Sequence, residues 1–495
     1  MEHVNTKTRT FFKETYKEFE EGELLMSSEE VKSTEAYPWK DIRGDYVLVP
    51  VPPWERRTLM NIFLVYTGVL SCLAVLWGGG ALGMQGSLYD VTVATVVGDI
   101  ILTVIGGLVA YIGGTAHQST YGIMRHIYGW YGSWIFGVLL SGIPAWGWFA
   151  YETWLFGVMI HDLAPQNPIC DIAWASLWGG LLMTTTAYVG YAGLAFLSYF
   201  TVPAFFVLVT AGFFAGIHFG GGFEKLWSFV PPQPVGLSVL ITQVVGLYVC
   251  GAIITPDIAR FARKAWHGSV AWGVQIMVLM TYYMIAASML TMAMGGTYFS
   301  KAMLMAGLGL GAYFVAIFGQ WTTNDNNLYS SALSWDVFIP VKKRILVLIL
   351  GILGSIYAWY TGLTAGASMQ PFIQFLVWLG TWLPPIGGVM IADFYVFQAY
   401  KGVPRSERYK MWVGKEIPLV NWPAWLAMVI GGACAQGWLM PASVLQVIPA
   451  SVIGLVMAFI VYIILAIPLD KAGVSIYIGK IKINEYGLPV KEVSK

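Results

Sequence analysis

Residues 320–331 (QWTTNDNNLYSS) are a polar stretch inside a long apolar segment of the chain. The stretch carries hydroxyls, amides and one carboxyl, groups that coordinate small cations and hydrogen-bond polar solutes. Hydrocarbon cannot hydrogen-bond such groups, so they are costly at membrane depth unless they line a cavity or bind something. The stretch therefore predicts a binding site within the membrane, and the rest of the chain must build the walls of that site.

Helical spacing places four residues around this stretch on one face: Gly319, Thr322, Asn326 and Tyr329. Thr322 and Thr323 are adjacent hydroxyls, and hydroxyl and carbonyl oxygens at a helix break suit a small hard cation such as sodium. The alternative is that each threonine hydroxyl donates to a carbonyl of its own helix, the better explanation for a lone threonine. The clustering of polar residues in TTNDNN favours the cation site.

A second candidate group lies in another apolar segment, where Ala145, Trp148 and Glu152 share a helical face. Trp148 offers a flat apolar surface with one N–H donor, and an ionisable residue such as Glu152 at this depth is a functional hypothesis by default. Their alternatives are core packing for Trp148 and a structural hydrogen bond for Glu152. Tyr248, from a third apolar segment, is a candidate for the opposite wall of an aromatic sandwich.

Two apolar segments carry residues that interrupt helices. Residues 58–80 end in the glycine triplet 78–80, and residues 235–259 contain Gly246, Gly251 and Pro256. Interrupted helices at matching positions of two halves predict an inverted-repeat transporter with a central site. The alternative is that these glycines only allow neighbouring helices to pack closely.

The composition is that of a membrane protein. The chain is 57% hydrophobic and 11% charged, whereas soluble domains carry roughly 25% charged residues. Its mean hydropathy is +0.65, and repeated apolar runs of about 20 residues predict an all-α polytopic fold with twelve transmembrane helices. The expected spans are 58–80, 91–114, 131–160, 173–194, 196–217, 235–259, 268–296, 303–330, 345–363, 371–398, 421–439 and 444–468.

The basic residues give the expected orientation. In this arrangement 26 of the 28 Lys and Arg residues fall on one side of the membrane, as the positive-inside rule requires. Only Lys225 and Lys301 fall on the other side. Both termini are therefore expected in the cytoplasm, and the plasma membrane is the expected location.

Enzymatic and nucleic-acid-binding functions find no support. The sequence has no P-loop, HExxH or GxSxG motif, and its four cysteines lack metal-ligand spacing. The net charge of +1 gives no basic surface for nucleic acid. We therefore expect neither an enzyme nor a cofactor, but a protein whose partners are lipid, a small molecule and a coupling ion.

Seven motifs together resemble the nucleobase:cation-symporter-1 family, also called the purine/cytosine permease family. They occur in order as VPVPPWERRT, WGGGALG, WGWF, TPDIARFAR, WTTNDNNLYSSAL, LPPIGGVMIADF and VNWPAWLA, and the likeness, closest to the cytosine permeases, covers residues 48 to 468. It implies a LeuT-type fold of two inverted five-helix repeats plus two further helices. The implied divisions are a cytoplasmic tail (1–57), repeats 58–217 and 235–398, two additional spans (421–468) and a second cytoplasmic tail (469–495).

The resemblance also implies a function and a site. It implies uptake of a planar nitrogen heterocycle driven by sodium or protons. We expect sodium as the coupling ion and a protein that works as a monomer. The flat ligand would lie between Trp148 and Tyr248. The implied sodium ligands are the hydroxyls of Thr322 and Thr323 and the carbonyls of Gly319, Gly68 and Ser71. The expected substrate-binding set is Trp148, Glu152, Tyr248, Cys250, Gly319 and Asn324.

This chain departs from the cytosine permeases at the polar contacts. Ala145, Leu247 and Cys250 stand where those proteins carry polar side chains, and Glu152 stands where hydantoin transporters have glutamine. A carboxylate accepts hydrogen bonds but donates none, which favours a donor-rich or cationic ligand. Two alternatives follow: a proton-coupled importer of a guanidine or amine that uses Glu152, and a channel or sensor that does not accumulate its ligand.

Overall fold

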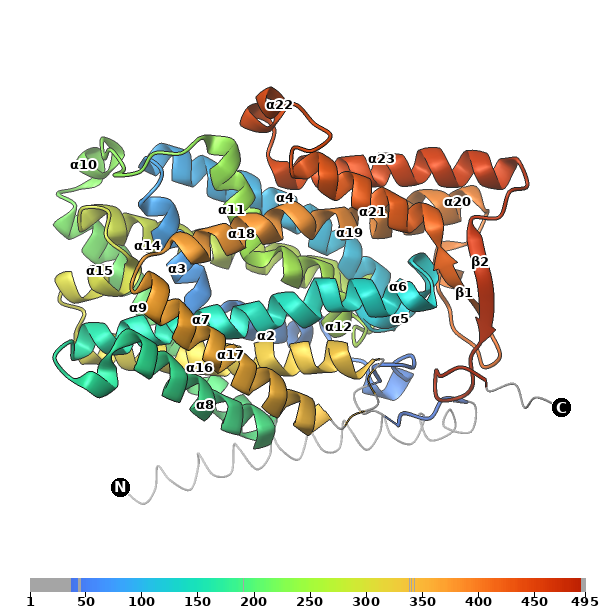
Figure 1. Ribbon diagram of the computed structural model, residues 1–495, viewed down its shortest axis with the longest axis horizontal. Coiled ribbons are helices and arrows are strands. Elements are labelled where there is room, and N and C mark those ends of the chain that lie inside the picture. Colours follow the sequence, from blue (N-terminus) through green and yellow to red (C-terminus); the bar gives the residue numbers. More distant parts are fainter. Residues whose placement is uncertain are drawn as a thin grey trace, which may run out of the picture.

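Long helices lying side by side form most of the molecule (Figure 1). The computed structural model describes residues 37–42, 46–189, 191–337, 339, 341 and 343–490. Within these residues seven helices are long and apolar enough to cross a membrane, or eight if one bent pair counts as a single span. The all-α polytopic class is confirmed, and the count of twelve crossings stays a prediction.

The first half of the chain supplies the helices α2 (Leu59–Leu70), α3 (Leu73–Gly83), α4 (Leu88–Ala116), α5 (Thr120–Ile127), α6 (Trp130–Gly137), α7 (Ile143–Leu163), α8 (Ile172–Val189), α9 (Tyr191–Phe219) and α10 (Phe223–Trp227). The π-helical turn η3 (Val138–Gly142) joins α6 to α7, and short 3-10 turns η2 (Pro53–Glu55) and η4 (Pro168–Cys170) precede α2 and α8.

The second half supplies α11 (Leu237–Ile253), α12 (Pro256–Ala259), α13 (Ala265–Val274), α14 (Thr281–Ala293), α15 (Phe299–Met305), α16 (Gly309–Asp336), α17 (Lys343–Ala365), α18 (Gln370–Trp382), α19 (Pro384–Ile391), α20 (Gln398–Tyr400), α21 (Trp422–Ala435), α22 (Ala442–Val447) and α23 (Ala450–Lys471). The π-helical turns η5 (Gln275–Met280) and η6 (Ala392–Phe397) interrupt two of these spans, and η7 (Arg405–Glu407) is a 3-10 turn. Strands β1 (Glu416–Asn421) and β2 (Tyr477–Lys482) pair antiparallel.

The first span is broken, as predicted, but at another place. Helices α2 and α3 meet at a bend of 55°, and the break lies at Ser71 and Cys72. The glycine triplet 78–80 lies inside α3. A Cβ at Gly79 would come within 2.5 Å of the Met284 carbonyl oxygen on α14. The packing alternative therefore explains the triplet, which brings α3 close to α14.

Of the three residues predicted to interrupt the sixth span, Gly246 and Gly251 do not, and only Pro256 marks an interruption. Helix α11 runs continuously through both glycines and ends at Ile253, so the interruption comes only before Pro256, where α12 begins. A Cβ at Gly246 would overlap the backbone carbonyl of Leu376 on α18. This glycine is therefore needed for helix packing, and Tyr248 lies within a regular helix rather than at a break.

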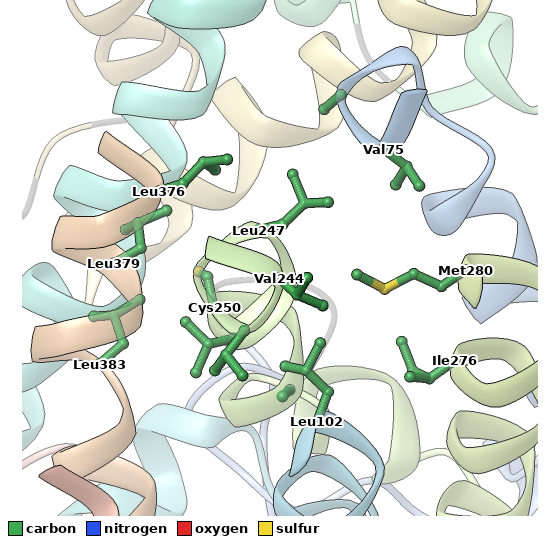
Figure 2. Packing of buried hydrophobic residues seen from close by; sticks show 14 of the residues in the cluster. Val75, Leu102, Val244, Leu247, Cys250, Ile276, Met280, Leu376, Leu379 and Leu383 are labelled. Carbon is green, nitrogen blue, oxygen red and sulfur yellow. The ribbon is translucent and has the colours of Figure 1, made fainter. Parts of the chain in front are cut away.

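Helix α11 passes through the middle of the largest apolar core. Figure 2 shows Val244, Leu247 and Cys250 of α11 between two groups of residues. Leu376 and Leu379 of α18 and Leu383, which directly precedes α19, lie on one side, and Val75 of α3, Leu102 of α4 and Ile276 and Met280 of η5 lie on the other. Leu247 and Cys250 are almost fully buried. The core therefore holds α11 rigidly against both neighbouring groups of helices.

The two ends of the helical body differ. Strands β1 and β2 and the described residues near both termini lie at one end, called here the sheet end, while α10 and α15 lie at the other (Figure 1). Lys225 is on α10 and Lys301 on α15, so the two basic residues excluded from the cytoplasmic side lie away from the sheet end. The arrangement agrees with the charge pattern, and the cytoplasmic assignment itself stays a prediction.

Residues 46–57, predicted as part of the cytoplasmic tail, are packed into the sheet end. Val49 and Val51 are buried, the Val51 N–H donates to the His117 carbonyl (2.8 Å), and the Ser119 hydroxyl donates to the Val47 carbonyl (2.6 Å). The predicted C-terminal tail supplies β2. The part of the N-terminal tail at residues 1–36 lies outside the described residues.

Three of the basic residues counted in the charge pattern are buried hydrogen-bond donors. The Arg125 guanidinium donates to the Gly487 carbonyl (2.9 Å), that of Arg260 to Tyr46 (2.8 Å), and that of Arg408 to Phe394 (2.7 Å). Each of these arginines is less than a tenth exposed. They therefore fix loops and terminal segments onto the helices.

We expect Gly246→Ala to lower the thermal unfolding midpoint of the detergent-solubilised protein, because the new methyl would overlap the Leu376 carbonyl. Overpacking of a tight core costs about 1–3 kcal/mol. Size-exclusion chromatography after heating measures the midpoint. Gly107→Ala in α4 is the matched control, since a Cβ there meets nothing within 4 Å. Equal midpoints for the two variants would contradict the close contact of α11 with α18.

Candidate substrate and ion site

The break between α2 and α3 leaves backbone groups without their helical partners. In a continuous helix the Cys72 N–H would donate to the Gly68 carbonyl, but here it donates to Leu70 (2.7 Å). The Ser71 hydroxyl donates to the Thr67 carbonyl (2.9 Å). Unwound carbonyls of this kind coordinate cations in transporters with broken helices. The break thus removes a regular helical hydrogen bond in the middle of a span.

Side chains from three other helices surround this break. The Cys72 thiol lies within electrostatic range of the Glu152 carboxyl of α7 and of the Tyr248 hydroxyl of α11. The Ser71 hydroxyl interacts with the Tyr283 hydroxyl of α14. The structure therefore brings the two predicted residues Glu152 and Tyr248 to the same break, although they are far apart in the sequence.

Glu152 is a buried carboxyl with an unsatisfied oxygen. It is 1% exposed, and its Oε2 has no hydrogen-bond partner among the described residues. The Asn327 amide lies beside the carboxyl, and the Gln320 amide donates to the backbone carbonyl of Glu152. A buried carboxyl that lacks a partner is costly unless a proton or a ligand satisfies it. Glu152 is therefore poised to bind a donor.

The two predicted aromatic walls each rest on a neighbouring ring. Trp148 is 7% exposed and makes an edge contact with Phe375 of α18, with ring centroids 5.2 Å apart. Tyr248 is half-buried and stacks on Trp272 of α13 at 5.5 Å with an interplanar angle of 23°. Apolar backing of this kind fixes ring orientation. A ligand held between Trp148 and Tyr248 stays a prediction.

The predicted cation ligands on α16 are partly described. Thr323 is 9% exposed, and its hydroxyl donates to the Gly319 carbonyl at 3.2 Å, which is the back-bonding alternative for a threonine in a helix. A hydroxyl that donates once keeps its lone pairs for a cation. The Thr322 side chain lies outside the described part of the chain. Helix α16 contacts α3, and the sodium ligand set Gly68, Ser71, Gly319, Thr322 and Thr323 stays a prediction.

Cys250 and Asn324 make contacts between helices. The Cys250 thiol donates to the Leu140 carbonyl in η3 at 3.1 Å. The Asn324 amide nitrogen lies within hydrogen-bonding distance of the Phe149 carbonyl (3.1 Å), the Thr153 hydroxyl (2.9 Å) and the Met183 sulfur (3.2 Å). Both donors therefore stabilise helix packing in this structure, and their contact with a substrate stays a prediction.

Gln275 is a buried polar residue that the sequence analysis did not select. It lies in the π-helical turn η5, is fully buried beside the Tyr248 hydroxyl, and neither polar atom of its amide has a geometrically good hydrogen bond among the described residues. π-helical turns are frequent at functional sites. The sequence does show Gln275 as a single polar residue in the apolar run VQIMVLM. Glu152 was selected because it is likewise a polar residue within an apolar segment.

The fold defines the class of protein. An inward-facing structure of Mhp1 superposes with a TM-score of 0.70 at 16% identity, covering 89% of this chain and 96% of that one. A closed conformation of Mhp1 with bromovinylhydantoin bound gives 0.64 at 16% identity, covering 88% and 97%. A sodium-coupled sialic acid symporter gives 0.54 at 12% identity, covering 82% and 89%. The chain therefore has the LeuT-type fold of membrane transporters.

The sequence comparison gives the family. Residues 50–464 match the family described as permease for cytosine/purines, uracil, thiamine, allantoin, and this chain belongs to that family. A cytosine permease of Escherichia coli strain K12 is 29% identical over 397 residues, which are 79% of this chain and 88% of that protein. The protein is thus a multi-pass membrane transporter of the nucleobase permease family.

We expect Asn324→Ala to lower the thermal unfolding midpoint, because it removes a buried donor shared by α7, α8 and α16. Leaving such acceptors unsatisfied costs about 1–3 kcal/mol. Asn326→Ala, at a half-buried position two residues further along, is the control. A wild-type midpoint for Asn324→Ala together with weakened substrate binding would instead assign this amide to the substrate.

Proposed function

We propose that the protein imports a small planar nitrogenous compound, a nucleobase such as cytosine or a related heterocycle, by sodium symport across the plasma membrane. The observation that supports this most is the α2–α3 break with the buried carboxyl of Glu152 and the hydroxyl of Tyr248 beside it. We further propose that a single copy of the chain carries out the cycle.

The substrate is held by stacking and selected by hydrogen bonds. Contacts of a flat ring with Trp148 and Tyr248 are worth about 1–3 kcal/mol each by analogy with base–aromatic stacking, and they tolerate many ring systems. Selection then falls to polar groups, of which the unsatisfied Oε2 of Glu152 is the strongest acceptor. We therefore propose a substrate edge rich in N–H donors, as in an aminopyrimidine or a creatinine-like compound.

Sodium couples substrate binding to the conformational change. The ion would bind between the Gly68 and Ser71 carbonyls of the broken span and the Gly319, Thr322 and Thr323 oxygens of α16. It would thereby join the broken span to the helix that lies against Glu152. Because both ligands favour the same arrangement of these helices, each should strengthen the binding of the other.

The test is uptake into proteoliposomes with and without a sodium gradient, for a panel of nucleobases, hydantoins and guanidine compounds. We expect Thr323→Ala to abolish the sodium stimulation, because it removes a coordinating hydroxyl. Thr364→Ala is the matched control, since the Thr364 hydroxyl also donates to its own helix (2.8 Å to Tyr360) on an exposed face.

Two results would overturn the proposal. Full sodium stimulation in Thr323→Ala would refute the ion site. Equilibration of every compound without uphill accumulation would show a channel or sensor rather than a symporter.

A proton-coupled importer of a guanidine or amine is the second candidate, favoured by the unsatisfied Oε2 of Glu152. In that mechanism Glu152 takes up and releases the coupling proton. Glu152→Gln should then uncouple uptake from an imposed pH gradient, while wild-type uptake follows the gradient. Unchanged dependence on the gradient in Glu152→Gln would rule this candidate out.

A further inference from the structure

A cavity of about 330 Å³ lies at the sheet end, away from the α2–α3 break. It opens between the segment that precedes α2, the end of α4 and the loop after α20. The lining side chains used below are Trp39, Arg56, Thr115, His117, Ser406 and Lys410. Ligand sites typically have volumes of about 300–1,000 Å³, so the cavity is large enough for a small ligand.

The charge of this cavity is positive. Arg56 and Lys410 contribute two cations, and the described lining contains no Asp or Glu. The nearest paired carboxylate is that of Glu407, which lies 3.2 Å from the Lys410 ammonium on the exposed surface. Glu407 offsets the charge of Lys410, and the end of α4 adds a partial negative charge of about half an elementary charge, so the Arg56 guanidinium is the cation that keeps the cavity positive.

Arg56 has unused hydrogen-bonding capacity. One terminal nitrogen of the guanidinium donates to the Val51 carbonyl at 3.3 Å, but its buried Nε has no partner among the described residues. A buried donor without a partner is costly, and a guanidinium presents several donors in one plane. Arg56 is therefore positioned to bind an acceptor with more than one oxygen.

His117 is consistent with a positive environment. Its Nδ1 lies 3.0 Å from the Arg260 carbonyl oxygen, which can only accept, so Nδ1 carries the hydrogen. In the neutral ring Nε2 then carries no hydrogen and is the nitrogen that a second proton would join. Burial, and then the Arg56 charge, lower the pKa of His117 to about 4. A bound anion would offset the repulsion from Arg56.

We propose that this cavity binds a phosphate group. A guanidinium, an ammonium and the hydroxyls of Thr115 and Ser406 form the donor set that recognises phosphate oxygens, and the Trp39 ring offers an apolar surface to whatever carries the phosphate. The phosphate belongs either to an anionic phospholipid headgroup or to a soluble phosphate or phosphate monoester, which share this chemistry.

The site joins parts of the chain that are distant in sequence. Arg56 directly precedes Arg57, whose backbone pairs with Phe261 and Arg263 after α12. Lys410 belongs to the loop after α20. A bound phosphate would therefore connect the segment that precedes α2 with the loop that follows α20. It would also stabilise the folded state by mass action.

The test uses full-length protein in neutral detergent, titrated with potassium phosphate against potassium chloride at matched ionic strength. A second arm compares nanodiscs of phosphatidylcholine alone with nanodiscs that also contain phosphatidylglycerol. The readouts are the phosphate dissociation constant and the thermal midpoint. The cavity variants are Arg56→Gln and Lys410→Gln, each expected to weaken binding about tenfold or more.

The control variants are matched to them. Arg57→Gln changes the neighbouring arginine, which is exposed and pairs with Glu55. Lys480→Gln changes an exposed lysine that pairs with Glu416 at 3.2 Å, as Lys410 pairs with Glu407. If Arg56→Gln does not fold, the exposed Lys410 position still allows the test.

Two outcomes support the site. Phosphate binding lost only in the cavity variants supports a soluble phosphate, and stabilisation by phosphatidylglycerol lost only in those variants supports a lipid headgroup. The proposal is overturned if neither addition stabilises the wild-type protein, or if the control variants lose as much as the cavity variants. The latter result would show general attraction to the basic end of the molecule.

Discussion

Backbone hydrogen bonding within a membrane is the constraint on which this architecture depends. A helix that breaks in the hydrocarbon region exposes N–H and C=O groups that lipid cannot satisfy. Here the break at Ser71 and Cys72 lies near polar side chains of α7, α11 and α14, namely Glu152, Tyr248 and Tyr283. The surrounding helices thus replace lipid with protein at the place where, in the proposed mechanism, a substrate and an ion supply the remaining contacts.

The polar residues of α16 serve two purposes. Asn324, Ser331 and Ser334 hydrogen-bond to α7 and to the region around η3, so they fix α16 in place. In the proposed mechanism Gly319 and Thr323 bind the ion. Some polar groups of the helix would then hold it in place while others exchange partners during a transport cycle.

Much of the fold could be predicted because it follows from composition and periodicity. The membrane class, the positions of the long helices and the buried Glu152 all follow from the cost of polar groups in lipid. The sequence predicted that the first span is broken but misplaced the break, because a glycine run signals close packing as readily as interruption. The position is given by the 55° bend between α2 and α3 and by the Cys72 N–H, which donates to the Leu70 carbonyl.

The features that sequence analysis missed depend on partners distant along the chain. Gln275 became a candidate because a π-helical turn directs it toward Tyr248, and no local pattern reveals that turn. The contacts of Cys250 with Leu140 and of Asn324 with Met183 likewise depend on how helices are placed side by side. Periodicity gives the face of a helix, but it does not say which neighbour that face meets.

The sheet end also has a consequence for biosynthesis. The Lys40 N–H donates to the Glu485 carbonyl (2.8 Å), and the buried Arg125 guanidinium donates to Gly487, so early and late residues complete one surface together. Proteins are made from the amino terminus onward. The early helices therefore enter the bilayer before residues 485–487, which complete the sheet end, have been synthesised.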